Sequence, residues 1–282
     1  MEIVTKFAPI CLALIMLGLG MGLTIQDFLR VSKQPKDFFV GLICQMILLP
    51  VIAFVLIKIF NTPIELALGV MIIAAAPGGV TSNVLTKFAN GDVALSVSLT
   101  AIVSLISIFS VPFIIFQSAE LLNITIFKEN ISMINISLKM FFVVTIPIIL
   151  GMIIRKLASS FVIEKSLIIQ RISIALFVLV FIAIYIEEWN KIVSFITRAG
   201  SVALALNIIM MIIGYYIAKI FISGVGQRRA ISLECGLQNG TLAVVVATQI
   251  FDDIVYMVPT AAYALIMMAT SIIFIFIVRK SV

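Results

Sequence analysis

Long apolar runs separated by short polar segments dominate this chain and limit what it can fold into. A helix needs about 20 mostly apolar residues to cross the hydrocarbon core of a bilayer. Runs of about that length or more cover 5–24, 38–60, 64–86, 93–118, 134–155, 168–187, 196–222, 229–250 and 256–278. Only 11% of the 282 residues are Asp, Glu, Lys or Arg, against about 25% in a soluble domain. The sequence therefore predicts an all-α polytopic membrane protein with about nine transmembrane helices.

The composition argues against most catalytic and metal-binding chemistry. The chain has no histidine, and its three cysteines stand singly, without the spacing of a zinc site or a disulfide framework. No HExxH, GxSxG or aspartate-rich motif is present. The net charge of +6 comes without a polybasic run, which favours a role in membrane topology over nucleic-acid binding. An intramembrane enzyme is a distant alternative, and no obligatory protein partner is expected.

Charged residues between the runs predict the orientation of the chain. The segments after the first, third, fifth and seventh runs, together with the C-terminal tail, carry most of the cations. These cations are Arg30, Lys33, Lys36, Lys87, Arg155, Lys156, Lys165, Arg171, Arg228, Arg229, Arg279 and Lys280. Because cytoplasmic loops are enriched in Lys and Arg, we expect the N-terminus outside and the C-terminus in the cytoplasm of a cell membrane. An odd number of spans gives the same placement.

Two of the runs contain residues that interrupt a helix at membrane depth. The third run contains Pro77, which lacks a backbone donor, followed by Gly78 and Gly79. The eighth run contains Gly236 and Gly240 around a Leu-Gln-Asn segment. Unwound segments of this kind expose carbonyls and helix N-termini, which bind ions and substrates in secondary transporters. A kinked helix with a packing glycine is the simpler alternative for either run alone, but two polar breaks, one in each half, favour a transporter.

Glu234 is the one carboxylate expected in the middle of a span. The other acidic residues lie at span ends, in loops or near a terminus. A charged side chain at a helix centre costs about 2.5–3.5 kcal/mol on insertion scales, so a proton, a cation or a partner residue must compensate it. No Lys or Arg is expected at the same depth. Glu234 therefore predicts a bound ion or a proton, with a protonated glutamate bonded to a neighbouring helix as the alternative.

Hydroxyl and amide side chains in other runs could complete such a site. Ser96 and Thr100 are four residues apart and share one helix face. Their hydroxyls are hard oxygen ligands suited to a cation such as sodium, and Gln45 lies in the middle of the second run. Taken alone, each of these residues is more often a hydrogen-bonding link between helices than a ligand.

Four segments, taken in order along the chain, resemble the bile acid:sodium symporter family, bacterial members included. They are 21–28 (MGLTIQDF), 77–83 (PGGVTSN), 91–100 (GDVALSVSLT) and 234–239 (ECGLQN). The resemblance extends over nearly the whole chain, and the order and spacing of the segments make it more specific than any one of them.

The resemblance implies a single transmembrane transporter domain over 1–282. Its core would comprise about 38–118 and 196–280, and its panel about 1–37 and 119–195. Inverted repeats are also implied, with the third and eighth runs forming two discontinuous helices that cross near the membrane midplane.

The same resemblance implies residues for two sodium ions and a substrate. The first sodium site would consist of Ser82, Asn83, Ser96, Thr100 and Glu234. The second would consist of Gln45, Glu234 and Gln238 with the main-chain oxygens of Cys235 and Leu237. The substrate is expected near Gly79, Thr81 and Asn239. Val80 stands where the family can carry threonine, a departure that bears on the identity of the substrate more than on the ions.

The implied function is sodium-coupled symport of small organic anions by alternating access. Bile acids, pantoate-like acids and keto acids are the expected substrate types. A proton-coupled carrier or an exporter of organic anions is the nearest alternative, because Glu234 could carry a proton instead of binding sodium. The expected partners are therefore the organic anion, sodium and the lipid bilayer.

Overall fold

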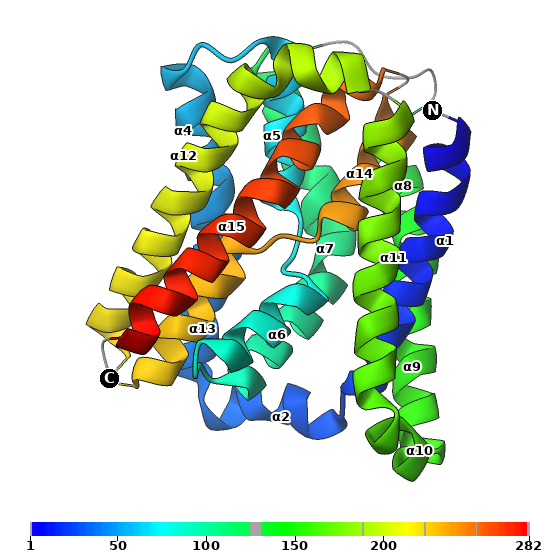
Figure 1. Cartoon of the computed structure of the whole chain (residues 1–282), viewed down its shortest axis with the longest axis vertical. Coiled ribbons are helices and arrows are strands. Elements are labelled where there is room, and N and C mark those ends of the chain that lie inside the picture. The colour runs from blue at the N-terminus through cyan, green and yellow to red at the C-terminus, as the bar shows by residue number, and fades with distance from the viewer. Residues whose placement is uncertain (1, 125–130, 188, 223, 252, 281–282) are drawn as a thin grey trace.

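The computed structural model describes residues 2–124, 131–187, 189–222, 224–251 and 253–280, which are almost entirely helical (Figure 1). The α-helices are α1 (Glu2–Gly22), α2 (Ile25–Lys33), α3 (Pro35–Ile43), α4 (Leu49–Ile59), α5 (Ile64–Ala75), α6 (Val80–Phe88), α7 (Val93–Leu121), α8 (Met133–Met140), α9 (Ile146–Leu157), α10 (Ser159–Glu164), α11 (Ser166–Glu187), α12 (Trp189–Phe221), α13 (Val225–Gly236), α14 (Gly240–Ile250) and α15 (Val258–Lys280). Two π-helical turns, Cys44–Leu48 and Phe141–Thr145, join α3 to α4 and α8 to α9. A 3-10 turn, Ile254–Met257, precedes α15.

Within the described ranges, seven helical segments are long and apolar enough to cross a membrane. They are Val4–Gly22, Pro35–Ile59, Val93–Leu121, Met133–Leu157, Ser166–Ile186, Thr197–Phe221 and Val255–Lys280. These segments confirm the prediction of a polytopic, almost wholly helical membrane protein. The other two predicted spans are each divided, one into α5 and α6 and one into α13 and α14. The total of nine crossings stays a prediction.

The divided helices occupy the centre of the molecule. All residues of α5 from 66 to 75 and all residues of α14 from 240 to 248 are buried. A helix that is apolar on every side is typical of such a position. Large apolar side chains such as Ile182 on α11 and Phe276 on α15 are instead exposed, where the acyl chains of a bilayer would cover them.

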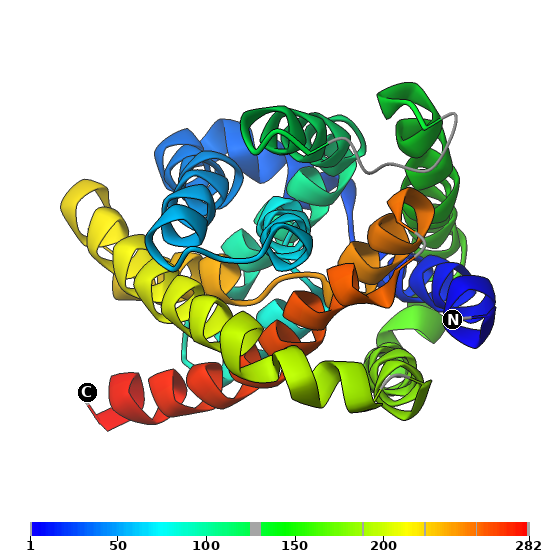
Figure 2. The ribbon, with the colours of Figure 1, turned by 90° about the horizontal axis from the view of Figure 1, so that it is seen from above.

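Two groups of helices flank the divided pairs. In one group α1 packs against α9 and α11, and in the other α12 packs against α15 and also contacts α13, the first half of one divided helix. Seen from above, α1 and α11 lie on one side and the yellow, C-terminal half of α12 on the other (Figure 2). Because α14 contacts α1 and α6 contacts α11, the second halves of the divided helices face the first group. The assignment of core, panel and inverted repeats stays a prediction.

The charged segment after the first span forms a short helix, α2, where a loop was expected. Thr24 precedes this helix, and its backbone N–H donates to the Asp27 carboxylate over 2.7 Å. An acidic side chain in the first turn that reaches back to the residue before the helix is a common way to stabilise a helix N-terminus. This local pairing explains why nine residues between two spans are helical.

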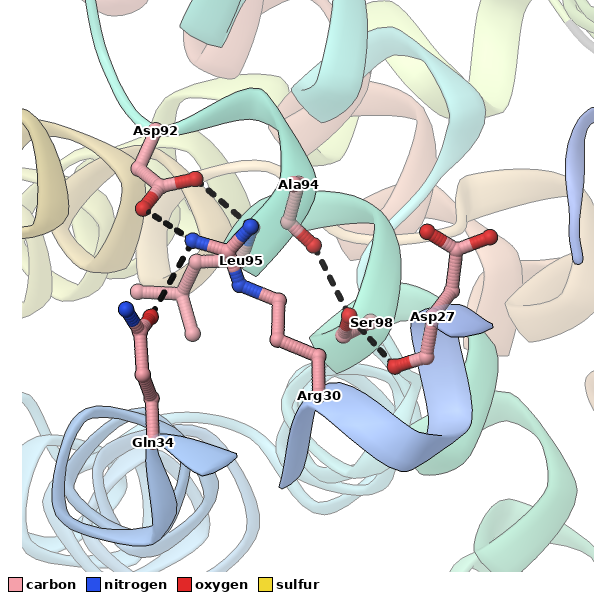
Figure 3. A network of polar contacts seen from close by, with 7 residues as sticks. All are labelled: Asp27, Arg30, Gln34, Asp92, Ala94, Leu95 and Ser98. Carbon is pink, nitrogen blue, oxygen red and sulfur yellow. Dashed lines mark hydrogen bonds and ion pairs between the residues drawn. The ribbon is translucent and has the colours of Figure 1, made fainter. Parts of the chain in front are cut away.

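The α2 helix is fixed to the start of α7 by polar contacts (Figure 3). Arg30 Nη2 lies 2.6 Å from Asp92 Oδ2. Asp92 also accepts the backbone N–H of Leu95 over 3.0 Å, which caps α7. On the same face, Ser98 Oγ donates to the carbonyl of Asp27 over 2.8 Å. Helix α2, which follows α1, is therefore held against α7 rather than against α9 or α11.

We expect Asp92→Ala to destabilise the protein more than Arg30→Ala. Both substitutions remove the ion pair, which contributes at most about 1 kcal/mol near a surface. Only Asp92→Ala also removes the α7 cap, at a cost of about 1 kcal/mol. Thermal unfolding of the two purified variants measures the difference, and equal midpoints would contradict the role assigned to the cap.

The eighth span begins earlier than predicted. Helix α13 starts at Val225, so Arg228 and Arg229 lie inside a helix rather than between spans. Arg229 is buried, at 5% exposure. Its guanidinium donates to the carbonyls of Ala89 and Val278. These bonds explain why this charged side chain is buried, which the apolar pattern of the sequence did not indicate.

Candidate functional site

The two divided helices meet at their breaks. α5 ends at Ala75 and α6 begins at Val80, while α13 ends at Gly236 and α14 begins at Gly240. Between these ends the backbone is extended, and Gly78 pairs with Gln238 as an antiparallel bridge. The N–H of Asn239 donates to the carbonyl of Pro77 over 2.7 Å. Each break thus supplies hydrogen-bonding partners to the other, as membrane depth requires.

Glu234 lies in the last turn of α13 with its carboxylate surrounded by hydroxyls. The residue is 1% exposed. Ser82 Oγ donates to Oε1 over 2.5 Å, Ser96 Oγ donates to the same oxygen, and Thr100 Oγ1 lies 3.1 and 3.0 Å from the two carboxylate oxygens. These donors come from α6 and α7, so the carboxylate connects three helices.

Asn83 completes this oxygen-rich cluster. Its Oδ1 accepts from Ser96 Oγ over 2.8 Å and from Thr100 Oγ1 over 3.3 Å. In the part of the chain that the structure describes, no Lys or Arg contacts the Glu234 carboxylate. The five residues named from the sequence for the first ion site therefore lie together, around a carboxylate that has hydroxyl donors but no cationic side chain.

Two buried glutamines lie on the other side of Glu234. Gln45 Nε2 donates to the Glu234 carbonyl over 3.4 Å, and Gln238 Nε2 donates to the Cys235 carbonyl over 3.0 Å. Both side chains are 1% exposed, and among the described residues neither Oε1 has a hydrogen-bond partner. A buried polar atom without a partner costs about 1–3 kcal/mol. A cation that both oxygens could coordinate would remove that cost.

The position of Gln45 depends on a local irregularity of its helix. It lies in the π-helical turn Cys44–Leu48, which is followed by Pro50. Proline removes a backbone donor and crowds the preceding turn, and a widened turn accommodates it while changing the direction of the side chains. Such turns are frequent at functional sites.

The residues named for the substrate line a small pocket beside the crossing. Gly79, Thr81 and Asn239 border it together with Thr241, and Phe177 of α11 closes one wall. Asn239 Oδ1 accepts the N–H of Leu242 and so caps α14. Within the described chain, Asn239 Nδ2 and Thr241 Oγ1 have no hydrogen-bond partner. The pocket therefore offers an amide donor and a hydroxyl between two helix N-termini, which favour an anion.

A wider cavity continues from this pocket. The small pocket has a volume of about 20 Å³, which holds little more than one water molecule. The adjoining cavity has a volume of about 570 Å³ and shares Val80 and Ser173 with it. It extends to Lys87 at the end of α6 and to Gln170 on α11. An organic anion fits only the wider part in this conformation.

Thr241, Lys87 and Gln170 also line these cavities, although none of the four segments quoted from the sequence contains them. For Thr241 a signal exists in the sequence. Thr81 stands two residues after Gly79 at the start of α6, and Thr241 stands two residues after Asn239 at the start of α14. The repeated spacing places a threonine in the first turn of each half-helix. Lys87 and Gln170 lie 83 positions apart in the sequence, and only the packing of α6 near α11 brings them to one cavity.

Comparisons with known proteins give three informative relatives. The chain is 32% identical over 254 residues to the probable sodium/metabolite cotransporter BASS1, chloroplastic, of Arabidopsis thaliana, a match that covers 89% of this chain and 61% of that protein. It is 29% identical over 262 residues to the uncharacterized sodium-dependent transporter YocS of Bacillus subtilis, with 93% and 79% covered. It is 25% identical over 264 residues to the ileal sodium/bile acid cotransporter of Oryctolagus cuniculus, with 90% and 73% covered.

The family resemblance found in the four sequence segments is confirmed by an independent match. The chain spans about 61% of the length of the Arabidopsis relative and 79% of the Bacillus one. The relatives are transporters by name, which agrees with the expectation that the family is not enzymatic. The model of the sodium bile acid symporter family matches residues 9–195, about two thirds of the sequence, and the chain therefore belongs to that family.

Proposed function

We propose that this chain is a sodium-coupled symporter that moves small organic anions across a cell membrane by alternating access. The observation that carries the proposal is the buried Glu234 carboxylate, which receives hydroxyl donors from two other helices at the crossing of two divided helices. The names of the relatives support sodium as the coupling ion.

The first sodium ion would bind in the hydroxyl cluster. Ser82, Asn83, Ser96, Thr100 and Glu234 supply hard oxygens of the kind that sodium prefers, with one formal negative charge among them. Hydroxyls that now donate to the carboxylate can turn, because a hydroxyl both donates and accepts. An ion that enters the cluster would therefore replace hydrogen bonds by oxygen–cation contacts without movement of the backbone.

The second sodium ion would bind on the glutamine side of Glu234. Gln45 and Gln238 supply two side-chain oxygens that have no hydrogen-bond partner among the described residues. Main-chain oxygens of Cys235 and Leu237 would complete the ligand set beside the carboxylate. Both ions share Glu234, so each would lower the repulsion that its negative charge presents to the anionic substrate.

The substrate would bind beside the crossing, near Gly79, Thr81 and Asn239. Thr241 joins this set, because it lines the same pocket and its hydroxyl has no hydrogen-bond partner in the described part of the chain. Sodium ions that tie α6 to α13 and to the break before α14 would fix both helix N-termini around one anionic group. Coupling then follows, since the anion site is complete only when the ions are bound.

The orientation proposed places the C-terminus in the cytoplasm. The two termini lie at opposite ends of the molecule, and α2 and α10 lie at the end that carries the C-terminus (Figure 1). The last turns of α2, α9 and α15 hold Arg30, Lys33, Arg155, Lys156, Arg279 and Lys280. That end would be cytoplasmic by the positive-inside rule. The cavity that reaches Lys87 would then open the crossing toward the cytoplasm.

The membrane potential would drive the cycle together with the sodium gradient. Each net positive charge that crosses gains about 2.3 kcal/mol per 100 mV. Two sodium ions with one monovalent anion carry one net charge inward. Release would follow as the helices that hold the ions move against α1 and α11.

Uptake into proteoliposomes tests the proposal against the alternative of a proton-coupled carrier. A buried carboxylate with hydroxyl neighbours is also compatible with that alternative, because it can carry a proton. Labelled pantoate, pyruvate and taurocholate serve as probes. We expect an inward sodium gradient with a negative interior to drive uptake of at least one probe, and an equal potassium gradient to drive none. Uptake of the same probe on a pH gradient without sodium would favour the proton-coupled carrier.

A further inference from the structure

Arg229 is a buried cation that takes no part in the site around Glu234. Arg229 and Glu234 are five positions apart on α13. At 3.6 residues per turn, their side chains point about 140° apart. Arg229 Nη1 donates to the Ala89 carbonyl over 3.0 Å and Nη2 to the Val278 carbonyl over 2.8 Å. These bonds hold the ends of α6 and α15 together.

The guanidinium keeps an unused donor and an unpaired charge. Among the described residues, Arg229 Nε is buried without a hydrogen-bond partner, and no carboxylate lies within ion-pair distance of the side chain. A guanidinium has five N–H donors, and a buried charge is normally paired. The two carbonyls explain where Arg229 points, but they supply no negative charge.

A cavity of about 370 Å³ lies beside this arginine, between α12, α13 and α15. Arg229 is the one charged residue among those that line it. The other walls are apolar or aromatic and include Ile212, Tyr215, Phe274 and Ile277. Ile212 is 51% exposed and Ile277 is 60% exposed, so the cavity lies on a surface that acyl chains would cover.

The surroundings of the cavity are positively charged. Lys219 lies over the ring of Tyr216, 5.8 Å from its centre, and Arg279 and Lys280 end α15. No Asp or Glu occurs in 205–233 or in 254–280. The stretches of α12, α13 and α15 that line the cavity therefore carry only positive charge, and Glu234, farther along α13, belongs to the site at the crossing.

We propose that this cavity binds an anionic phospholipid, with its phosphate at Arg229 and one acyl chain against Ile212 and Phe274. The chemistry of the site matches both parts of such a molecule: for the phosphate, a buried guanidinium whose Nε has no hydrogen-bond partner among the described residues, and for the chain, an apolar wall. Basic pockets between membrane helices bind anionic lipid headgroups in this way. The site is separate from the ion site and goes beyond the function proposed above.

Thermal unfolding in nanodiscs tests this proposal. The purified full chain is placed in phosphatidylcholine alone or in phosphatidylcholine mixed with phosphatidylglycerol. A lipid that binds only the folded protein stabilises it, and we expect phosphatidylglycerol to raise the unfolding midpoint by roughly 3 °C. Inorganic phosphate added to phosphatidylcholine nanodiscs is expected to give no rise, because it lacks the acyl chain.

Three variants locate the effect. Arg229→Gln removes the charge, and Ile212→Trp fills the apolar wall while leaving both carbonyl bonds of Arg229 in place. We expect both to lose the rise. Ile182→Trp is the matched control, since Ile182 is 52% exposed and lies on α11, which contributes no lining residue to the cavity, and it should keep the rise. Equal midpoints in the two lipids, a full rise in Ile212→Trp, or a full rise from phosphate alone would overturn the proposal.

Discussion

Glu234→Gln is expected to abolish sodium-driven uptake while leaving the protein folded in the membrane. The amide has the shape of the carboxylate and can still bond to Ser82 and Thr100, so the packing of α6, α7 and α13 is kept. The substitution removes the negative charge of Glu234, which the two proposed sodium sites would share. A pair of unit charges 4 Å apart gains about 4 kcal/mol at an effective dielectric constant near 20, which corresponds to roughly a thousandfold in affinity.

Glu164→Gln is the matched control for this experiment. It makes the same chemical change on an exposed carboxylate of α10 that pairs with Lys165. We expect its uptake and its sodium dependence to equal those of the unchanged protein. If Glu234→Gln transported with unchanged sodium dependence, Glu234 would not be the residue through which sodium acts.

Gly78→Ala is expected to remove sodium-driven uptake by steric means alone. A methyl group at position 78 would collide with Glu234 Oε2 and would lie 3.1 Å from Gln45 Nε2. The carboxylate and the amide belong to separate elements, α13 and the π-helical turn Cys44–Leu48, so the methyl group forces them apart. The second ion site would lose its geometry although every one of its residues is still present.

Gly200→Ala isolates the steric effect. No described residue outside its own helix turn lies within 4 Å of a methyl group at Gly200 on α12, and alanine is favoured over glycine inside a helix by about 1 kcal/mol. We expect this control to transport normally and to be at least as stable as the unchanged protein. The readout for both variants is the initial rate of sodium-driven uptake. An equal value for Gly78→Ala and Gly200→Ala would contradict the geometry assigned to the crossing.

Several features of the fold followed directly from the sequence because membrane depth leaves few alternatives. Pro77 with two glycines cannot continue a helix, and the structure places the break between Ala75 and Val80. Glu234 stood out as an acid inside an apolar run, and its companions Ser96 and Thr100 had the spacing of one helix face. These inferences rest on local chemistry, which a single sequence contains.

Other features depend on packing between distant segments. Arg228 and Arg229 are chemically identical neighbours. Arg229 is the buried one because its guanidinium donates to the carbonyls of Ala89 and Val278, which come from distant segments. The π-helical turn around Gln45 and the α2 helix depend instead on local geometry, which apolar periodicity does not record either. The seven long segments are continuous, whereas the assignment of core, panel and inverted repeats stays a prediction from the family resemblance.

The central claim is that sodium binds at the crossing beside Glu234. Thermal unfolding of the purified protein in sodium chloride and in potassium chloride of equal concentration tests it most directly. An ion that binds only the folded state stabilises it by about 2.7 kcal/mol per site when its concentration is a hundred times its Kd. We expect a higher unfolding midpoint in sodium than in potassium for the unchanged protein, and equal midpoints in the two salts for Glu234→Gln. Coincident curves in the two salts for the unchanged protein would contradict it.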